Sequence, residues 1–196
     1  MLKVGLTGNM GSGKSTVSRL FELLCVPVYN ADRESKKFLE AIAVRKQVAG
    51  LFGNAILDSG QNIDRKLLAG IVFSDPKALQ SLNNILHPLV KRDFILWSRM
   101  FSERAYIVHE AAIIFESGFQ DEFDFIIHVS CPNEIAVERV IIRDGLSREK
   151  ILDRMQFQME DEKKTTLSDF VIRNDGSEML IPQVLAIHQQ LSEVGA

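Results

Sequence analysis

The sequence predicts an α/β protein in which helices flank a parallel β-sheet. Short apolar segments, typical of buried strands, alternate along the chain with longer stretches whose apolar residues recur at helical spacing. Strands that alternate with helices pair in parallel, because a parallel pair needs a long crossover connection. With 46% hydrophobic and 25% charged residues, the chain of 196 residues has the composition of a folded globular protein. The expected strands lie at residues 2–6, 26–29, 105–108, 125–129 and 169–172.

The long region between the second and third expected strands, residues 32–101, is expected to be helical. Asp75 followed by Pro76 predicts a helix start, since aspartate caps helices and proline is favoured at the first helical position. The apolar residues that follow keep helical spacing up to His87-Pro88, where we expect the helix to be interrupted. The region is too long for one crossover, so we expect it to form a helical subdomain that covers a substrate.

Charge and hydropathy argue against several classes of partner. The 23 Lys and Arg residues against 26 Asp and Glu residues give a formal charge of −3, without the basic excess of a dedicated nucleic-acid-binding protein. No apolar run approaches the roughly 20 residues that cross a bilayer, and Met1–Thr7 lacks the pattern of a secretory signal. Cys25 and Cys131 lack zinc-site spacing and are expected to be buried, reduced thiols. We therefore expect a cytoplasmic protein that binds neither nucleic acid nor membrane.

A glycine-rich segment directly follows the first expected strand and precedes a helix. Residues 8–15, Gly-Asn-Met-Gly-Ser-Gly-Lys-Ser, match the phosphate-binding pattern G-x-x-x-x-G-K-[ST] at every fixed position. Glycines let backbone N–H groups point at phosphate oxygens, the lysine neutralises their charge, and the serine hydroxyl can bind Mg²⁺. The positive end of the helix dipole favours the same anion. The segment predicts a nucleotide site, with Ser15 as the metal ligand, formed by Gly11, Ser12, Gly13, Lys14, Ser15 and Thr16.

The other motifs favour a small-molecule kinase over a GTPase, because the guanine-reading Asn/Thr-Lys-x-Asp string and the Asp-x-x-Gly string are both absent. Asp32 follows the second expected strand, and parallel strands end at the same edge of a sheet. Its carboxylate would therefore lie near the phosphate loop, where it could accept a proton from an attacking hydroxyl. A role for Asp32 as the N-cap of a helix over residues 33–38 fits its position about as well.

Arginines after the fourth expected strand predict a lid. Arg139 and Arg143 are four residues apart and so share one face of a helix that Asp144-Gly145 ends. Ser147 can cap the next helix. Guanidinium groups suit phosphate oxygens, and a closing lid keeps water away from ATP. A solvated charged helix face is the alternative interpretation.

These segments resemble the dephospho-CoA kinase family along almost the whole chain. The resemblance begins with Gly5–Thr16 and continues with Asn30-Ala31-Asp32, where the family's first Asp is Asn30. Its most discriminating part is absent from generic P-loop kinases and comprises Gly60, Ile63-Asp64-Arg65, Leu68, Val72-Phe73, Leu82-Asn83 and Leu86-His87-Pro88. Further matching segments are Ala112–Glu116, with Ala112 in place of Pro, the lid residues Arg139 to Gln158, and Asp169–Gly176. Met159-Glu160 departs from the family's Gln-x-Pro ending.

The resemblance implies a P-loop kinase-type fold with a helical substrate-binding insertion and a lid. It implies phosphorylation of the ribose 3′-hydroxyl of dephospho-CoA by ATP, with Mg²⁺ as cofactor and Asp32 as the catalytic carboxylate. Lys14, Arg139 and Arg143 are the other expected catalytic residues. The resemblance also implies acceptor-side roles for Arg65 and His87 and a nucleotide-side role for Asn174.

The expected division of the chain follows from these motifs. We expect a nucleotide-binding core of residues 1–31, 102–140 and 161–196, an acceptor-binding subdomain of residues 32–101 and a lid of residues 141–160. ATP and dephospho-CoA are the expected partners of a monomer or weak homo-oligomer. Two alternatives stay open: another small-molecule or nucleoside monophosphate kinase, and a regulatory switch that binds a nucleotide without turning it over.

Overall fold

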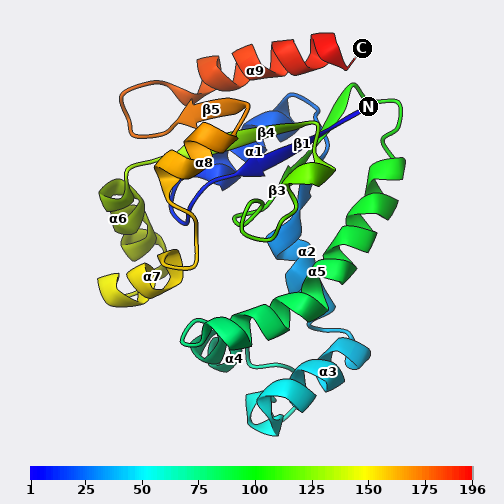
Figure 1. Ribbon diagram of the computed structural model, residues 1–196, viewed down its shortest axis with the longest axis vertical. Helices are drawn as coiled ribbons and strands as arrows, with labels where there is room; N and C mark the ends of the chain where they lie inside the picture. The colour runs from blue at the N-terminus through cyan, green and yellow to red at the C-terminus, as the bar shows by residue number, and fades with distance from the viewer. Residues whose placement is uncertain (196) are drawn as a thin grey trace. The chain divides into compact units, whose positions relative to one another are not determined.

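The structure, a computed structural model that describes residues 1–195, contains a five-stranded parallel sheet (Figure 1). Its strand order is β2-β3-β1-β4-β5, which confirms the predicted fold class. Each expected strand is present, with bounds that differ from the expectation by at most two residues. The strands are β1 (Leu2–Thr7), β2 (Val28–Asn30), β3 (Tyr106–Glu110), β4 (Phe125–Ser130) and β5 (Phe170–Arg173).

Three of these strands end at neighbouring positions on the carboxyl edge of the sheet. Leu6 of β1 is in register with Glu110 of β3, and Asn30 of β2 pairs with the same Glu110. The glycine-rich segment begins directly after β1, at Gly8. The chain leaves this edge again after Asn30, where β2 ends.

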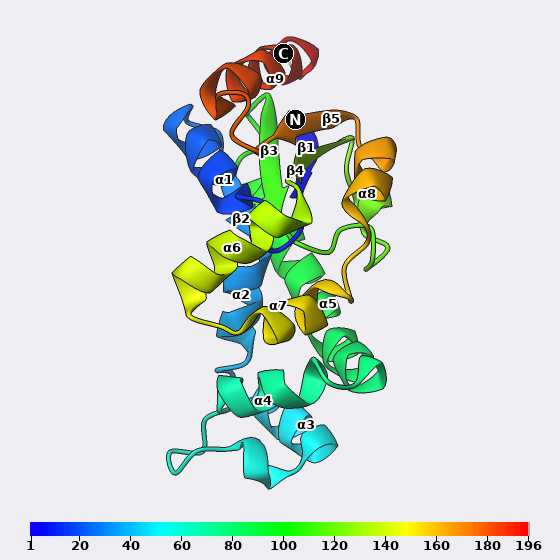
Figure 2. The same ribbon diagram turned by 90° about the vertical axis from the view of Figure 1, so that its left-hand side faces the viewer.

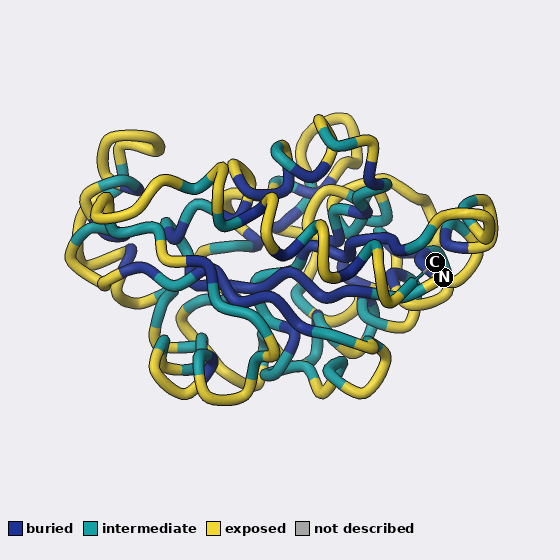
Figure 3. The backbone as a smooth tube through the Cα atoms, turned by 90° about the horizontal axis from the view of Figure 1, so that it is seen from above, coloured by how far each residue is buried: buried dark blue, intermediate teal, exposed yellow. Residues whose placement is uncertain are grey.

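The chain divides into two compact units, and the sheet belongs to the first, which comprises Met1–Asn30 and the described residues from Trp97 onward. Figure 2 shows α1 and α8 on opposite faces of the sheet. Because helices cover both faces, the central strands β1, β3 and β4 are largely buried and form the core of this unit together with the inner faces of α1 and α9 (Figure 3). Its helices are α1 (Lys14–Leu23), η2 (Gln120–Glu122), α6 (Asn133–Asp144), α7 (Arg148–Met155), α8 (Asp161–Leu167) and α9 (Leu180–Val194).

The second unit, Ala31–Leu96, is helical and has a hydrophobic core of its own. Two of its helices begin at aspartate caps, as local sequence chemistry dictates. The Asp64 side chain accepts hydrogen bonds from the backbone N–H groups of Lys66 and Leu67, at 2.8 and 3.1 Å. Asp75 likewise accepts from the N–H of Lys77, at 2.9 Å. The helices are α2 (Ala31–Phe38), α3 (Ile42–Phe52), η1 (Asn54–Ile56), α4 (Arg65–Val72) and α5 (Pro76–Arg99), which extends three residues beyond the unit.

The prediction that a helix ends at His87-Pro88 is wrong. Helix α5 starts at Pro76 as predicted but continues through Pro88 to Arg99. Its buried apolar side chains continue on both sides of the proline, at Leu86 and Val90. Burial of this apolar face outweighs the hydrogen bond that a proline removes from a helix interior.

Two further expectations are corrected. Helix α2 begins at Ala31, so Asp32 lies within its first turn and is not its N-cap. Cys25 is exposed, because it occupies a left-handed turn (φ 59°) just after α1, whereas Cys131 is buried as predicted. Over residues 1–195, the structure contains no helix with the length and apolar character that a membrane span requires.

Candidate functional site

The glycine-rich segment forms a tight loop between β1 and α1, and an added side chain at Gly11 or Gly13 would clash with a neighbouring residue. Gly11 and Gly13 have φ angles of 81° and 93°, in the region that favours glycine. A Cβ atom on Gly11 would lie 2.2 Å from the carbonyl oxygen of Ala136 on α6. A Cβ atom on Gly13 would lie 2.1 Å from Nδ2 of Asn174. The loop can therefore pack this closely against α6 and Asn174 only because side chains are absent at these points.

The polar side chains of the loop are arranged around its backbone. Lys14 is 9% exposed, and its Nζ donates to the carbonyl oxygen of Gly8 at 2.8 Å. The Ser12 hydroxyl is buried and has no hydrogen-bond partner among the described residues. Ser15 and Thr16 are exposed in the first turn of α1. A cationic side chain, an unused buried hydroxyl and a helix N-terminus at one loop are the groups that bind phosphate.

Asn174 supports the loop from the segment that follows β5. Its Nδ2 donates to the carbonyl oxygen of Ser12 at 2.7 Å, and its backbone N–H donates to that of Ser130 at 2.9 Å. Asn174 thus joins the phosphate loop to the end of β4. A direct contact between Asn174 and a nucleotide stays a prediction.

Arg139 and Arg143 lie on α6, as the spacing predicts, but they contact different groups. The Arg139 guanidinium donates to Sγ of Cys131 at 3.4 Å. Arg143 is exposed and forms two hydrogen bonds to the Asp144 carboxylate, at 2.7 and 2.8 Å. These bonds hold the pKa of Asp144 below its ordinary value and raise that of Arg143. Gly145 ends the helix with φ 64°, and the Ser147 side chain caps α7 by accepting from the N–H of Lys150.

The remaining predicted residues lie in the second unit. Asp32 is exposed and comes two residues after Asn30, the last residue of β2. His87 is half-buried in α5, and burial holds the pKa of its imidazole below the ordinary value. Arg65 is the first residue of α4, and its Nη2 lies 2.6 Å from Oε1 of Glu40.

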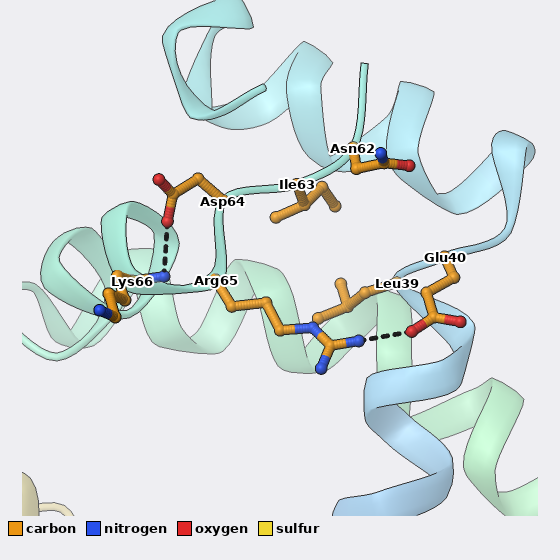
Figure 4. A pocket seen from close by; sticks show the side chains of 7 residues that line it. All are labelled: Leu39, Glu40, Asn62, Ile63, Asp64, Arg65 and Lys66. Atoms are coloured by element: carbon orange, nitrogen blue, oxygen red, sulfur yellow. Dashed lines mark hydrogen bonds and ion pairs between the residues drawn. The ribbon is translucent and has the colours of Figure 1, made fainter. Parts of the chain in front are cut away.

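Arg65 also lines a surface pocket of about 560 Å³ within this unit (Figure 4). In Figure 4 the Arg65 guanidinium extends toward Glu40, while the Asp64 carboxylate turns back to the backbone of Lys66. His87 is not among the described residues that line the pocket, so the structure does not bring Arg65 and His87 together there. The lining residues are Leu39, Glu40, Asn62, Ile63, Asp64, Arg65 and Lys66.

The sequence interpretation missed one acidic residue at the carboxyl edge of the sheet. Glu110 ends β3 next to the strand that leads into the phosphate loop, and it is 6% exposed. The Asn30 side-chain amide donates a hydrogen bond to its Oε2. A carboxylate at the end of a strand-like segment, Tyr106–Glu110, is the local signal that could have drawn attention to this residue. Within residues 1–195, no group of three or more His, Cys, Asp or Glu residues is arranged to hold a metal ion.

The strand order, the glycine-rich loop after β1 and the buried lysine define a nucleotide-binding protein of the P-loop kinase class. A family model described as dephospho-CoA kinase matches residues 2–179. The chain therefore belongs to the dephospho-CoA kinase family.

Individual relatives agree with this assignment. A dephospho-CoA kinase of Bacteroides fragilis is 44% identical over 187 residues, which cover 95% of this chain and 91% of the relative. A crystal structure of a Thermus thermophilus protein superposes with a TM-score of 0.84 at 33% identity and covers 96% of each chain. A dephospho-CoA kinase from Campylobacter jejuni gives a TM-score of 0.70 at 26% identity, with coverage of 99% of this chain and 98% of that one.

Proposed function

We propose that the protein transfers the γ-phosphoryl group of ATP to the ribose 3′-hydroxyl of dephospho-CoA, which gives CoA and ADP in the last step of coenzyme A biosynthesis. The observation that carries this proposal is a phosphate-binding loop with a buried lysine in a chain that the dephospho-CoA kinase family model matches at residues 2–179. Phosphoryl transfer depends mostly on positioning and on stabilising charge, for which this loop is suited.

We assign the reacting groups from residue chemistry and from the family resemblance. The loop N–H groups and Lys14 hold the ATP phosphates. Asp32 accepts the proton of the attacking hydroxyl, and its position in the turn that follows β2 supports this role. Arg139 and Arg143 offset the charge on the transferring phosphoryl group. For Arg143 this requires exchange of its exposed pair with Asp144, and an exposed ion pair is weak enough to exchange.

We also propose that Mg²⁺ accompanies ATP. The oxygen donors near the loop fit a hard cation, which prefers carboxylate and hydroxyl ligands. Ser15 offers an exposed hydroxyl in the first turn of α1, and Glu110 offers a carboxylate at the end of the adjacent strand β3. When bound, the ion would neutralise charge on the phosphate oxygens.

The helical unit is proposed to bind the acceptor. Arg65 lines its pocket and could reach an anionic group of the acceptor once released from Glu40. His87 is assigned to the same side on the resemblance alone. Residues 141–160 are proposed to act as the lid, with α7 as its main element.

The identity of the acceptor is tested by measuring ADP release with dephospho-CoA, AMP, adenosine and shikimate as separate acceptors. We expect release to be stimulated at least ~10-fold more by dephospho-CoA than by any other compound. Equal stimulation by AMP would indicate a nucleoside monophosphate kinase. Tight ATP binding without stimulation by any acceptor would indicate a regulatory switch.

The role of Asp32 is tested by Asp32→Asn, which keeps the size of the side chain and removes its basicity. We expect kcat to fall by about 10²- to 10⁴-fold, the usual contribution of a general base, while ATP affinity stays within about 3-fold. Asp121→Asn, a substitution of another exposed carboxylate, serves as the control and should leave kcat unchanged. An unchanged kcat in Asp32→Asn would remove this residue from the mechanism.

A further inference from the structure

The residues at the end of the proposed lid make direct hydrogen bonds to the phosphate loop. The backbone N–H of Met10 donates to Oε1 of Gln158 at 2.9 Å. The Asn9 side-chain amide donates to the carbonyl oxygen of Met159 at 3.2 Å. We call Gln158-Met159 the lid exit, because it follows α7 and precedes α8. Two neighbouring residues of the loop are thus held by two neighbouring residues of the lid exit.

The lid exit is held in turn by an ion pair between a buried lysine and a largely buried glutamate. Oε1 of Glu116 accepts from the backbone N–H of Met159 at 2.7 Å and lies 2.8 Å from Nζ of Lys164. Lys164 is fully buried, and its Nζ also donates to the carbonyl oxygen of Ala112 at 2.9 Å. A buried ammonium group that loses its carboxylate is strongly destabilising, so the position of Glu116 is tightly constrained.

A second anchor fixes the start of α8, the helix that carries Lys164. Asp161 at the start of α8 accepts from Ser130 at 2.5 Å and lies 2.9 Å from Nε2 of His128, and both of these residues belong to β4. Burial acts to raise the pKa of Asp161, but the hydrogen bonds from His128 and Ser130 outweigh it and keep the carboxyl ionised. With α8 fixed on β4, Lys164 has little freedom to follow the lid if it moves.

We infer that Glu116 and Lys164 are positioning residues for the nucleotide site. They act on this site indirectly, through the hydrogen bonds of the lid exit. Lys164 orients the Glu116 carboxylate, Glu116 holds the N–H of Met159, and Met159 with Gln158 holds the phosphate loop at Asn9 and Met10. Neither charged residue touches the loop itself. The inference rests on the proposed function for its kinetic readout, but its central measurement is the binding of ADP.

The structure also explains why Glu160, the residue after the lid exit, can occupy the position where the family has proline. Glu160 is the N-cap of α8 and has φ −55°, within the range that a proline ring imposes. The backbone path is therefore the one that proline would give. Its direction is maintained here by the hydrogen bonds on Met159 and Asp161.

The test compares two double variants in which the buried charges are removed together. Lys164→Met/Glu116→Gln keeps a side-chain oxygen that can accept from the N–H of Met159, whereas Lys164→Met/Glu116→Leu does not. Replacing a buried ion pair by uncharged residues of similar volume often leaves a protein folded. A single substitution here would instead leave the other charge without its partner and would destabilise the fold. The two proteins therefore differ in the contact that the inference requires.

We expect the Leu variant to bind ADP about 10-fold more weakly than the Gln variant, a loss of the size of one hydrogen bond. The Gln variant should bind ADP within about 3-fold of the unmodified protein. In steady-state assays KM for ATP should rise in the Leu variant while KM for dephospho-CoA stays constant. Tyr106→Phe, which removes a partly buried hydrogen bond of 2.6 Å to His188 elsewhere in the unit, should leave ADP affinity unchanged.

Equal ADP affinities in the two double variants would overturn the inference. If Glu116 and Lys164 had a purely structural role, the substitutions would change the fraction of protein that is folded but not the ADP affinity of the folded protein. If either double variant fails to fold, the single variant Gln158→Ala gives the second measurement. It removes the acceptor of the Met10 N–H without touching a buried charge, and an unchanged ADP affinity there would also overturn the inference. Failure of dephospho-CoA as acceptor, with the ADP result intact, would instead reject the proposed function.

Discussion

At the scale of single residues, steric exclusion at Gly11 is the sharpest constraint on the phosphate loop. We expect Gly11→Ala to lower the free energy of unfolding by more than Gly118→Ala, which also has a positive φ but no heavy atom within 4 Å of the added Cβ. The control should lose about 1–2 kcal/mol from backbone conformation alone. Gly11→Ala should lose about 1–3 kcal/mol more, because its Cβ meets the backbone of α6. Urea unfolding measures both, and equal losses would contradict the close approach.

A second residue, His109, makes stability depend on pH. It is 2% exposed on β3, where its ring stacks on Tyr29 and lies against Phe123, with centroid separations of 5.2 Å to each. Burial lowers the pKa of its imidazole from 6.5 to about 3. The native state therefore keeps His109 neutral at a pH where the unfolded chain binds a proton. Stability contributed by this neutral form is complete above pH 6.5 and decreases as the pH falls toward 3.

The expected loss from His109 between pH 6.5 and 5 is about 1–2 kcal/mol, since the unfolded imidazole is half protonated at pH 6.5 and the slope approaches about 1.4 kcal/mol per pH unit only below that. His109→Phe keeps an aromatic ring between Tyr29 and Phe123 and removes the titrating group. Its free energy of unfolding should fall less steeply over this range, when both proteins are unfolded in urea at several pH values. Identical slopes would show that folding does not lower the pKa of His109.

Residue identities could be predicted where a backbone motif determines them and not where packing decides. Gly8, Gly13, Lys14 and Ser15 are evident from the fixed spacing of the loop, whose geometry requires those residue types. Glu110 was missed because only the pairing of β3 between β1 and β2 gives its carboxylate a position next to the loop. Such long-range register is not encoded in local spacing.

At the scale of the element, α5 departs most from local rules, because Pro88 lies within it. We expect Pro88→Ala to raise the free energy of unfolding by about 1–3 kcal/mol, since alanine restores a backbone donor and removes a clash with the preceding turn. Pro76→Ala is the matched control, because proline at the first position of the same helix costs nothing. Urea unfolding should therefore show a gain only at Pro88. A lower free energy of unfolding in both variants would mean that both proline rings make packing contacts that the helix needs.

The helices that could be predicted are those with local start and stop signals. The Asp75 cap, Gly145 at the end of α6 and the Ser147 cap of α7 are all found as expected. The continuation of α5 could not be predicted, because the burial of Val90 and Phe94 that sustains it is a property of the folded core. The bonds of the lid exit are equally non-local, since Met10 and Gln158 are 148 residues apart in the sequence.

At the scale of the whole molecule, the proposed ligands should act on different units. The phosphate loop and the arginines of α6 lie in the unit that contains the sheet, whereas Arg65 and its pocket lie in the helical unit. Each unit has its own buried core, so ligand binding to either unit can be detected by hydrogen exchange at the backbone amides of that unit. This separation gives a test of the proposed division of labour that needs no turnover.

We expect ADP alone to slow hydrogen exchange in the phosphate loop and α1, and dephospho-CoA alone to slow exchange around residues 39–40 and 62–66, which line the helical pocket. At a ligand concentration near 100 Kd the slowing should approach about 100-fold where exchange requires the unbound form to open. Lys14→Ala should abolish the effect of ADP and keep that of dephospho-CoA, because the lysine belongs to the loop alone. Protection of residues 62–66 by ADP but not by dephospho-CoA would reverse the assignment of the acceptor to the helical unit. Protection of neither segment by dephospho-CoA would show that the acceptor binds outside this pocket.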